Sequence, residues 1–419
     1  MDVETGAVVD SVAANRSLPP ASVTKAITAG FGLKSLGADH VFTTQLIAVG
    51  DVVDGQLQGD LILQGGGDPT LHTDQLVDMA RALEAAGIWD VTGRFLVSDA
   101  GFPFLREIDP SQPPQVGYNP AVSGINLNFN RVRFDWARQS GGRYDMSMRA
   151  AGEQYRPYIP FSRIIAEDRT SPNYTHRLMG DGELWTVRKS ALGAKGGRWL
   201  PTRIPRIYAG EALRGICRTS SIVLPRPEIS NDTFDGQVIH TARSAAYTDV
   251  ARDMLKYSTN LTAEAIGFSA SAMPDLPQSA AALSAFAREN GMTGSFADHS
   301  GLSDQSRVSP MGLARFMVAQ RETGLRDILK VMPLRENNVA LPGVILQAKT
   351  GSLNFVSTLA GYVTVESKTM AFAIMTADLT KRAAIKPEDR ERPDGGGYWA
   401  QQSRSLQYSL LRNWLGHLT

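Results

Sequence analysis

Three short polar motifs lie far apart in this 419-residue chain and constrain its fold more than any other feature. Ser22-Val-Thr-Lys25 stands near the start, Ser258-Thr-Asn260 follows 236 residues later, and Lys349-Thr-Gly-Ser352 a further 91 residues on. Each motif carries groups that acyl transfer through a serine ester requires. If they form one site, residues near both ends of the chain must meet around it, and the long first gap must be an insertion.

The first motif combines a nucleophile with a candidate base. Serine is a poor nucleophile that needs a base, and residues three apart lie on one face of a helix. Burial disfavours the charged form of lysine, so a desolvated Lys25 can take the proton of Ser22 near neutral pH. Pro19 and Pro20 fit the start of a helix over 22–36, which places Ser22 at its positive end. A Ser-x-x-Lys pair also arises by chance about once in such a chain.

The second motif lies between helices expected over 246–255 and 263–271. A loop there can turn Ser258 and Asn260 inward, so that the hydroxyl relays a proton and the carboxamide holds a substrate amide. The alternative is an ordinary helix N-cap, which Thr262 and Glu264 would support.

The third motif closes a strand expected over 344–349. Gly351 lets a substrate backbone lie close to the strand, and Lys349, Thr350 and Ser352 offer a cation and hydroxyls to a carboxylate. The backbone N–H groups of Ser352 and Ser22 can form an oxyanion hole. The alternative is an ordinary turn at a strand end.

The composition excludes several classes of function. Lysine and arginine number 43 against 42 acidic residues, so nucleic acid and anionic membranes are poor partners. Cys217 is the one cysteine and is expected to fill space in a core, while six scattered histidines disfavour a metal enzyme. No stretch approaches the ~18 apolar residues of a membrane span, and the first twenty residues lack the apolar region of a signal peptide.

Apolar periodicity predicts further elements. Helices are expected at 74–86, 278–289, 309–322 and 403–418, and strands at 41–49, 57–63, 94–97, 356–365 and 370–376, with Gly30 and Gly32 interrupting the first helix. Recurring aromatic and aliphatic residues in 100–240 predict β-containing insertions rather than a disordered linker. We therefore expect a discontinuous catalytic domain, 1–47 and 241–419, and an accessory region, 48–240, that forms two small domains.

The order and spacing of the motifs resemble those of penicillin-binding proteins and serine β-lactamases. The long first gap is similar to that of the low-molecular-mass class C group, the D-alanyl-D-alanine carboxypeptidases and endopeptidases of peptidase family S13. Further matching stretches are Pro20-Ala-Ser-Val-Thr-Lys25, Gly59-Asp-Leu-Ile-Leu-Gln-Gly-Gly-Gly-Asp-Pro-Thr-Leu71, Ser300-Gly-Leu-Ser303 and Ala348-Lys-Thr-Gly-Ser-Leu353. The resemblance covers nearly the whole chain.

The resemblance implies an α+β penicillin-binding fold, with helices on a five-stranded antiparallel sheet and β-rich domains inserted between the first two motifs. It implies peptidoglycan stem peptides as substrates, β-lactams as covalent inhibitors, no cofactor or metal, and a periplasmic or otherwise extracytoplasmic location. The resemblance also implies a role for each site residue. Ser22 would be the acylated nucleophile and Lys25 its base, while Ser258 and Asn260 would take part in proton transfer and substrate binding. The substrate carboxylate would be bound by Lys349, Thr350, Gly351 and Ser352, and the N–H groups of Ser22 and Ser352 would form the oxyanion hole.

The sequence also departs from the family pattern. Thr259 stands where Asp or Asn is usual, Asp304 where arginine is common, and His299 where glycine is usual. A structural loop role is favoured for His299 over a role as catalytic base. The family normally has a strand before the Thr5-Gly6 turn, so we expect that the sequence lacks the natural start and a secretion leader.

Two other interpretations stay open. A β-lactamase or a D-amino-acid esterase or amidase shares the fold, but no Glu-x-x-Leu-Asn stretch, the deacylating element of class A β-lactamases, lies between the first two motifs. A non-catalytic cell-wall-binding protein with a vestigial site would have no need of both Lys25 and Lys349.

Overall fold

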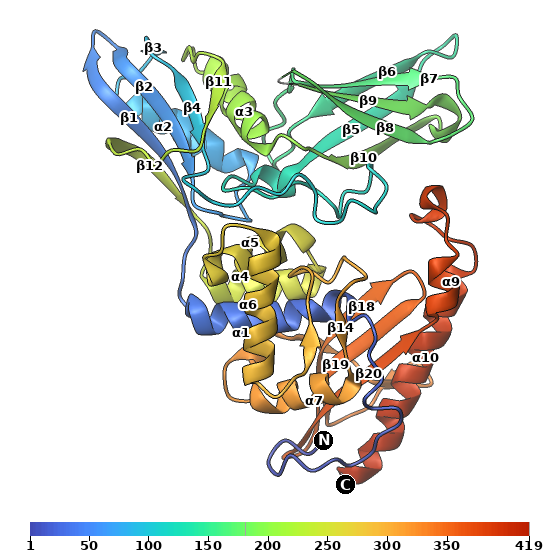
Figure 1. Ribbon diagram of the computed structural model, residues 1–419. Helices are drawn as coiled ribbons and strands as arrows, with labels where there is room; N and C mark the ends of the chain where they lie inside the picture. The colour runs from blue at the N-terminus through green and yellow to red at the C-terminus, as the bar shows by residue number, and fades with distance from the viewer. Residues whose placement is uncertain (181, 419) are drawn as a thin grey trace. The chain divides into compact units, whose positions relative to one another are not determined.

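The chain divides into two compact units in the computed structural model, which describes residues 1–180 and 182–418. The first unit joins residues 1–40 to the part of the chain from Ala246 onward, and the second is Val41–Ala245 (Figure 1). The expected boundaries at 47/48 and 240/241 fall inside β1 (Thr43–Val53) and β12 (Gln237–Arg243). These two strands pair with each other from Thr43 and Arg243 onward, so both belong wholly to the second unit.

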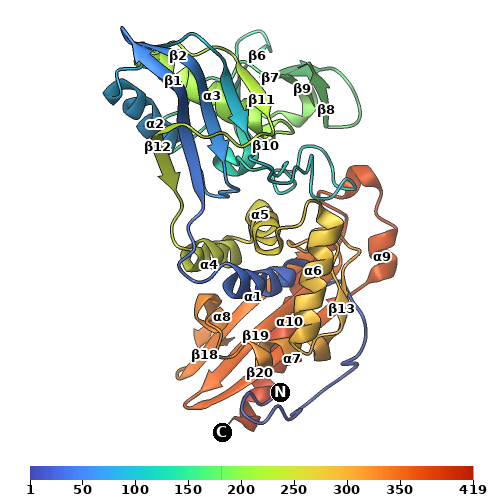
Figure 2. The same cartoon turned by 60° about the vertical axis from the view of Figure 1, so that its left-hand side comes forward.

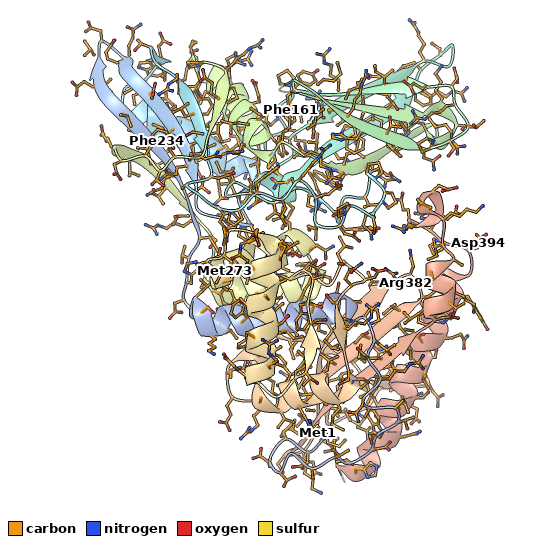
Figure 3. All side chains as sticks on the ribbon, viewed as in Figure 1. Met1, Phe161, Phe234, Met273, Arg382 and Asp394 are labelled. Carbon is orange, nitrogen blue, oxygen red and sulfur yellow. The ribbon has the colours of Figure 1, made fainter. Side chains whose placement is uncertain are left out.

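An antiparallel sheet lies at the centre of the first unit. Its order is β15 (Lys330–Met332), β18 (Val344–Leu353), β19 (Val356–Val365) and β20 (Lys368–Ala377). The described residues thus form four of the five expected strands. At the outer edge of β20 the N-terminus makes a single bridge, between Asp2 and Met370, and the ammonium of Met1, labelled in Figure 3, donates to the Ala371 carbonyl at 2.8 Å.

Helices cover both faces of this sheet. Leu411 of α10 (Gly396–Trp414) is buried against alternate strand residues that include Ala348 and Phe372. On the other face, the Tyr362 hydroxyl donates to the Met317 carbonyl of α7 (Pro310–Ala319) at 2.5 Å. Side chains alternate along a strand, so Lys349 points away from α10.

A group of helices lies beside the sheet (Figure 2). They are α1 (Thr24–Ser35), preceded by the 3-10 turn η1 (Ala21–Val23), α4 (Tyr247–Tyr257), α5 (Asn260–Ser271), α6 (Leu276–Glu289) and α8 (Leu325–Ile328). Helix α9 (Leu379–Ala383) stands apart from this group, and the 3-10 turns η4 (Pro387–Asp389) and η5 (Leu415–His417) also belong to the C-terminal part of the chain. Short strand pairs join β13 (Gly294–Ser295) to β14 (Arg307–Val308) and β16 (Arg335–Glu336) to β17 (Val339–Ala340).

Helix α1 runs without a break through Gly30 and Gly32, contrary to the interruption expected there. A Cβ on Gly32 would stand 2.1 Å from the Tyr247 hydroxyl, and that hydroxyl donates to the Ala29 carbonyl at 2.8 Å. Glycine at position 32 therefore permits close packing of α1 on α4.

The described residues of the second unit form three sheets and two helices, α2 (Thr73–Ala85) and α3 (Pro205–Thr219). The largest sheet joins β11 (Pro227–Ser230), β4 (Phe95–Ser98), β2 (Gln56–Gly65), β1 and β12, with β3 (Asp90–Val91) beside β2. The others join β10 (Lys195–Pro201), β5 (Arg131–Arg138) and β6 (Tyr144–Arg149), and β7 (Ser162–Glu167), β9 (Gly182–Arg188) and β8 (Tyr174–Met179). Short 3-10 turns are η2 (Leu127–Asn130) and η3 (Lys189–Ala191).

The larger hydrophobic core of this unit joins all three sheets, beside a small cluster of Ile47, Ile62 and Leu96, where two small domains were expected. Leu63 of β2, Phe134 of β5 and Trp185 of β9 come from different sheets and belong to the same buried cluster. Cys217 of α3 is buried in that cluster, where burial raises the pKa of its thiol to about 12. Within the described residues, the helices are too short or too polar to cross a bilayer.

Candidate active site

The nucleophile candidate lies on the turn that begins α1. Ser22 is the middle residue of η1 and is partly exposed, whereas Val23 and Lys25 are buried. The preceding residue, Ala21, has a φ of 49°, a conformation that costs energy in a residue with a Cβ. The turn therefore holds Ser22 at a fixed place at the N-terminal end of the helix.

Lys25 lies one turn further along and is enclosed by the protein. Its Nζ donates to Ser22 Oγ at 3.1 Å, to Asn260 Oδ1 at 2.7 Å and to the Ser300 carbonyl at 2.7 Å. Burial lowers the pKa of Lys25 from 10.5 to about 8, and the carboxylates of Asp298 and Glu264 partly oppose that shift. A lysine with this pKa can exchange a proton with a serine hydroxyl near neutral pH.

The second motif lies at the junction of α4 and α5. Ser258 ends α4 in the left-handed region, with a φ of 59°, and Asn260 is the first residue of α5. Thr259 occupies the N-cap position but makes no side-chain capping bond. The Ser258 hydroxyl and the Asn260 carboxamide instead contact the two lysines, so the N-cap alternative lacks its capping hydrogen bond.

Lys349 comes from the last part of β18 and is 2% exposed. Its Nζ donates to Ser258 Oγ at 3.1 Å and to the Thr350 carbonyl at 2.7 Å. Burial, followed by the repulsion of Lys25 and Lys330, lowers the pKa of Lys349 from 10.5 to about 7. A desolvated ammonium of this kind gains from a bound anion, because an opposite charge restores part of the lost solvation.

The rest of the third motif follows along β18. Thr350 and Ser352 are exposed, whereas Gly351 is buried against the turn that carries Ser22. Contacts of Lys25, Lys349 and Gly351 thus bring the predicted site residues of the three motifs together in the first unit, and Ser352 follows as the next residue of β18.

Two buried carboxylates near the lysine were missed as site residues. Glu264 accepts from the backbone N–H groups of His299, at 3.1 Å, and Ser300, at 2.9 Å. Asp298 accepts from the N–H groups of Gly301, at 2.5 Å, and Ser303, at 2.7 Å. Burial, followed by repulsion from Asp298, raises the pKa of Glu264. The sequence did contain one indication that Glu264 belongs to the site: it follows Asn260 by four residues and therefore lies on the same face of the helix.

The two departures in the loop after α6 have structural explanations. His299 is buried, its Nε2 lies 2.7 Å from the Ser279 hydroxyl, and burial lowers its pKa to about 3. This contact favours the structural role over that of a base. Asp304 pairs with Arg382 at 3.5 Å, and Arg382, labelled in Figure 3, also donates to the Asn354 carbonyl at 3.0 Å.

A serine on a helix-starting turn, a buried lysine one turn later and a basic strand against that turn define the class: the penicillin-binding fold of acyl-serine enzymes. Residues 1–391 match the D-Ala-D-Ala carboxypeptidase 3 (S13) family, and the chain belongs to this family of serine peptidases.

Individual relatives agree with this placement. The chain is similar to the D-alanyl-D-alanine carboxypeptidase DacB of Haemophilus influenzae, with 25% identity over 415 residues, which covers 88% of this chain and 84% of the relative. A D-alanyl-D-alanine carboxypeptidase of Actinomadura sp. is 35% identical over 139 residues, 32% of this chain and 25% of that protein. The crystal structure of penicillin binding protein 4 (dacB) from Haemophilus influenzae superposes with a TM-score of 0.75 and 20% identity, covering 98% of this chain and 94% of that one.

Proposed function

We propose that this protein is a serine-type D-Ala-D-Ala carboxypeptidase or DD-endopeptidase that acts on peptidoglycan stem peptides and is acylated by penicillin. The observation that supports it most directly is the contact of Lys25 Nζ with Ser22 Oγ at 3.1 Å in a buried setting that lowers the lysine pKa. Family membership gives the substrate class. Because peptidoglycan lies outside the cytoplasmic membrane, the protein works in an extracytoplasmic compartment.

In the proposed reaction, neutral Lys25 takes the hydroxyl proton of Ser22 as Oγ attacks the carbonyl of the penultimate D-alanine. The N–H groups of Ser22 and Ser352 stabilise the oxyanion that forms. Collapse of this intermediate breaks the C–N bond, and Ser258 relays a proton to the departing amine. Water then hydrolyses the ester and regenerates Ser22.

The carboxylate of the substrate binds at the third motif in this proposal. Lys349 supplies the cation, and Thr350 and Ser352 supply hydroxyls that are exposed on β18. Gly351 lets the substrate backbone approach the strand. Asn260 holds a substrate amide while its Oδ1 accepts from Lys25.

The test is labelling with a fluorescent penicillin followed by mass spectrometry. We expect one stoichiometric adduct on Ser22, no adduct in Ser22→Ala and much slower labelling in Lys25→Ala. Labelling that persists in Ser22→Ala would remove the assignment of the nucleophile.

Peptide substrates and a cephalosporin separate the alternatives. Release of D-alanine from a stem pentapeptide identifies a carboxypeptidase, and cleavage of a cross-linked dimer identifies an endopeptidase. Rapid steady-state turnover of a chromogenic cephalosporin would instead identify a β-lactamase. If none of the three substrates reacts, the remaining interpretation is a non-catalytic cell-wall-binding protein.

A further inference from the structure

The three hydrogen bonds of Lys25 define what its amine can do once it loses a proton. An ammonium has three N–H donors, and here each meets one acceptor: Ser22 Oγ, Asn260 Oδ1 and the Ser300 carbonyl. A neutral amine keeps two N–H groups and one lone pair. If Asn260 and Ser300 retain the two N–H groups, the lone pair points at Ser22.

The Ser300 carbonyl can act in this way because its loop is held on several sides. Glu264 accepts from the N–H groups of His299 and Ser300, and the Thr28 hydroxyl donates to the His299 carbonyl at 2.7 Å. Asp298 accepts from the N–H groups of Gly301 and Ser303. Both carboxylates are fully buried, so water does not compete for these bonds.

The loop also packs directly on the nucleophile turn. Gly301 has a φ of 71°, and a Cβ there would lie 1.9 Å from the Ala21 carbonyl oxygen and 2.7 Å from Thr24 Oγ1. A displacement of the loop would therefore reach both the base and the turn that holds Ser22.

The two residues that position the Lys25 amine, Asn260 and Glu264, both lie on helix α5. Asn260 begins α5 and contacts the amine directly, and Glu264 lies four residues later on the same face and contacts it through the Ser300 loop. The rigid helix thus fixes the spacing between the two acceptors.

We propose that Glu264 is the main positioning residue of the catalytic base, with Asp298 as its support: together they fix the Ser300 carbonyl so that neutral Lys25 directs its lone pair at Ser22. The inference rests on the proposed function. In the step that Glu264 serves, the Ser22 O–H bond breaks as Oγ bonds to the substrate carbonyl carbon, the proton moves to the Lys25 lone pair, and the carbonyl π electrons move to oxygen.

The charges near Lys25 mean that the positioning role of Glu264 should also change the pH dependence of acylation, which a purely structural role would not. The two carboxylates favour the ammonium form of Lys25, whereas Lys349 on β18 is a second cation that interacts with it. The raised pKa of Glu264, about 8, leaves part of this carboxyl ionised in the pH range where Lys25 titrates, so removing that charge while keeping the shape of the side chain favours the neutral amine. The acid limb of the rate profile should then move to lower pH.

The experiment measures the acylation rate constant with fluorescent penicillin in the full chain, and the pH profile from about pH 5.5 to about 9.5 with a carboxy-amidated peptide, whose rate does not depend on the charge of Lys349. We expect Glu264→Ala to slow acylation ~10²-fold through loss of geometry. Glu264→Gln keeps an acceptor oxygen for Ser300, so its rate should stay within ~10-fold of the parent while its acid limb shifts to lower pH. Asp298→Asn should fall between them.

Asp275 provides the matched control, because it is also a carboxylate that accepts a backbone N–H, from Gln278 at 2.9 Å, in the same unit. Asp275→Ala should lose the stability of a helix cap and keep the parental rate and pH profile. Thermal unfolding of each variant shows which ones are folded.

An acylation rate in folded Glu264→Ala equal to that of the parent protein would overturn the proposal. An acid limb of Glu264→Gln at the same pH as that of the parent protein would also overturn it, because Glu264 would then have a purely structural role. If Glu264→Ala does not fold, Glu264→Gln still decides between these outcomes. Failure of the parent protein itself to acylate at Ser22 would be a failure of the proposed function and is seen separately.

Discussion

Gly351 lies so close to Ser22 that neither the strand nor the turn has room for a side chain between them. A Cβ on Gly351 would stand 3.1 Å from the Ser22 amide nitrogen and 2.7 Å from the Pro20 carbonyl oxygen. Backbone contact thus links β18 to the start of α1. In the proposed reaction, a substrate that lies along the strand would therefore lie beside the serine.

Gly351→Ala should push the strand away from the turn. We expect at least a ~10-fold loss of penicillin acylation and about 1–3 kcal/mol of lost stability, because the added methyl meets backbone atoms that cannot rotate away. Gly397→Ala is the control, since its Cβ would meet nothing within 4 Å on α10. It should keep full acylation and gain up to about 1 kcal/mol. Equal behaviour of the two variants would contradict the close contact.

The pH dependence of kcat/KM should be a narrow bell for a substrate with a free carboxylate. Lys25 works as the neutral amine, and the fraction in that form grows as pH rises through about 8, the pKa that burial gives it. Lys349 works as the cation, and the fraction in that form falls as pH rises through about 7, so the rate follows the product of the two fractions. The optimum should lie between these values. A broad plateau over this range would show that at least one lysine has another role.

Lys349→Ala should discriminate between substrates by their terminal group. Acylation by a peptide with a free carboxylate should fall ~10²-fold or more, because a desolvated charge-assisted bond is lost, whereas an amidated peptide should lose far less. The amidated peptide should also lack the alkaline limb with the parent protein. Equal losses for both peptides would contradict the role of Lys349 as carboxylate anchor.

Lys349→Met should abolish this anchor and yet stabilise the fold. The folded-state pKa of Lys349 is about 7, below its ordinary 10.5, so its burial opposes folding fully below pH 7 and ceases to do so as pH rises to 10.5. After the lost hydrogen bonds are counted, we expect a gain of about 1–2 kcal/mol at acidic pH that shrinks with rising pH.

Urea unfolding of Lys349→Met at acidic and alkaline pH measures this gain. Lys34→Met is the matched control, because Lys34 is 60% exposed and pairs with Glu289 on the surface. It should change stability by less than about 0.5 kcal/mol, with little dependence on pH. A destabilised Lys349→Met variant at acidic pH would contradict the cost assigned to the buried ammonium.

Local sequence was sufficient for much of the catalytic unit. The helix after Ser22 and the strands around 344–376 follow from periodicity and are present close to their expected ranges, whereas the C-terminal helix, expected at 403–418, begins earlier, at Gly396. The boundaries of the inserted unit were less accurate, because the pairing of β1 with β12 joins residues about 200 positions apart. Alternation within each strand gives no sign of that pairing.

The sequence by itself determined which groups are available: a serine with a lysine one helical turn away, a hydroxyl–amide pair and a basic strand with a glycine. Only the tertiary structure decided how those groups are charged and aimed. In the sequence, Glu264 looks like an ordinary helical glutamate. In the structure it is buried and accepts a hydrogen bond from His299, 35 residues away, in the loop whose Ser300 carbonyl contacts Lys25. The physical reason is that a pKa depends on desolvation and on neighbouring charges, and both come from residues distant in the chain.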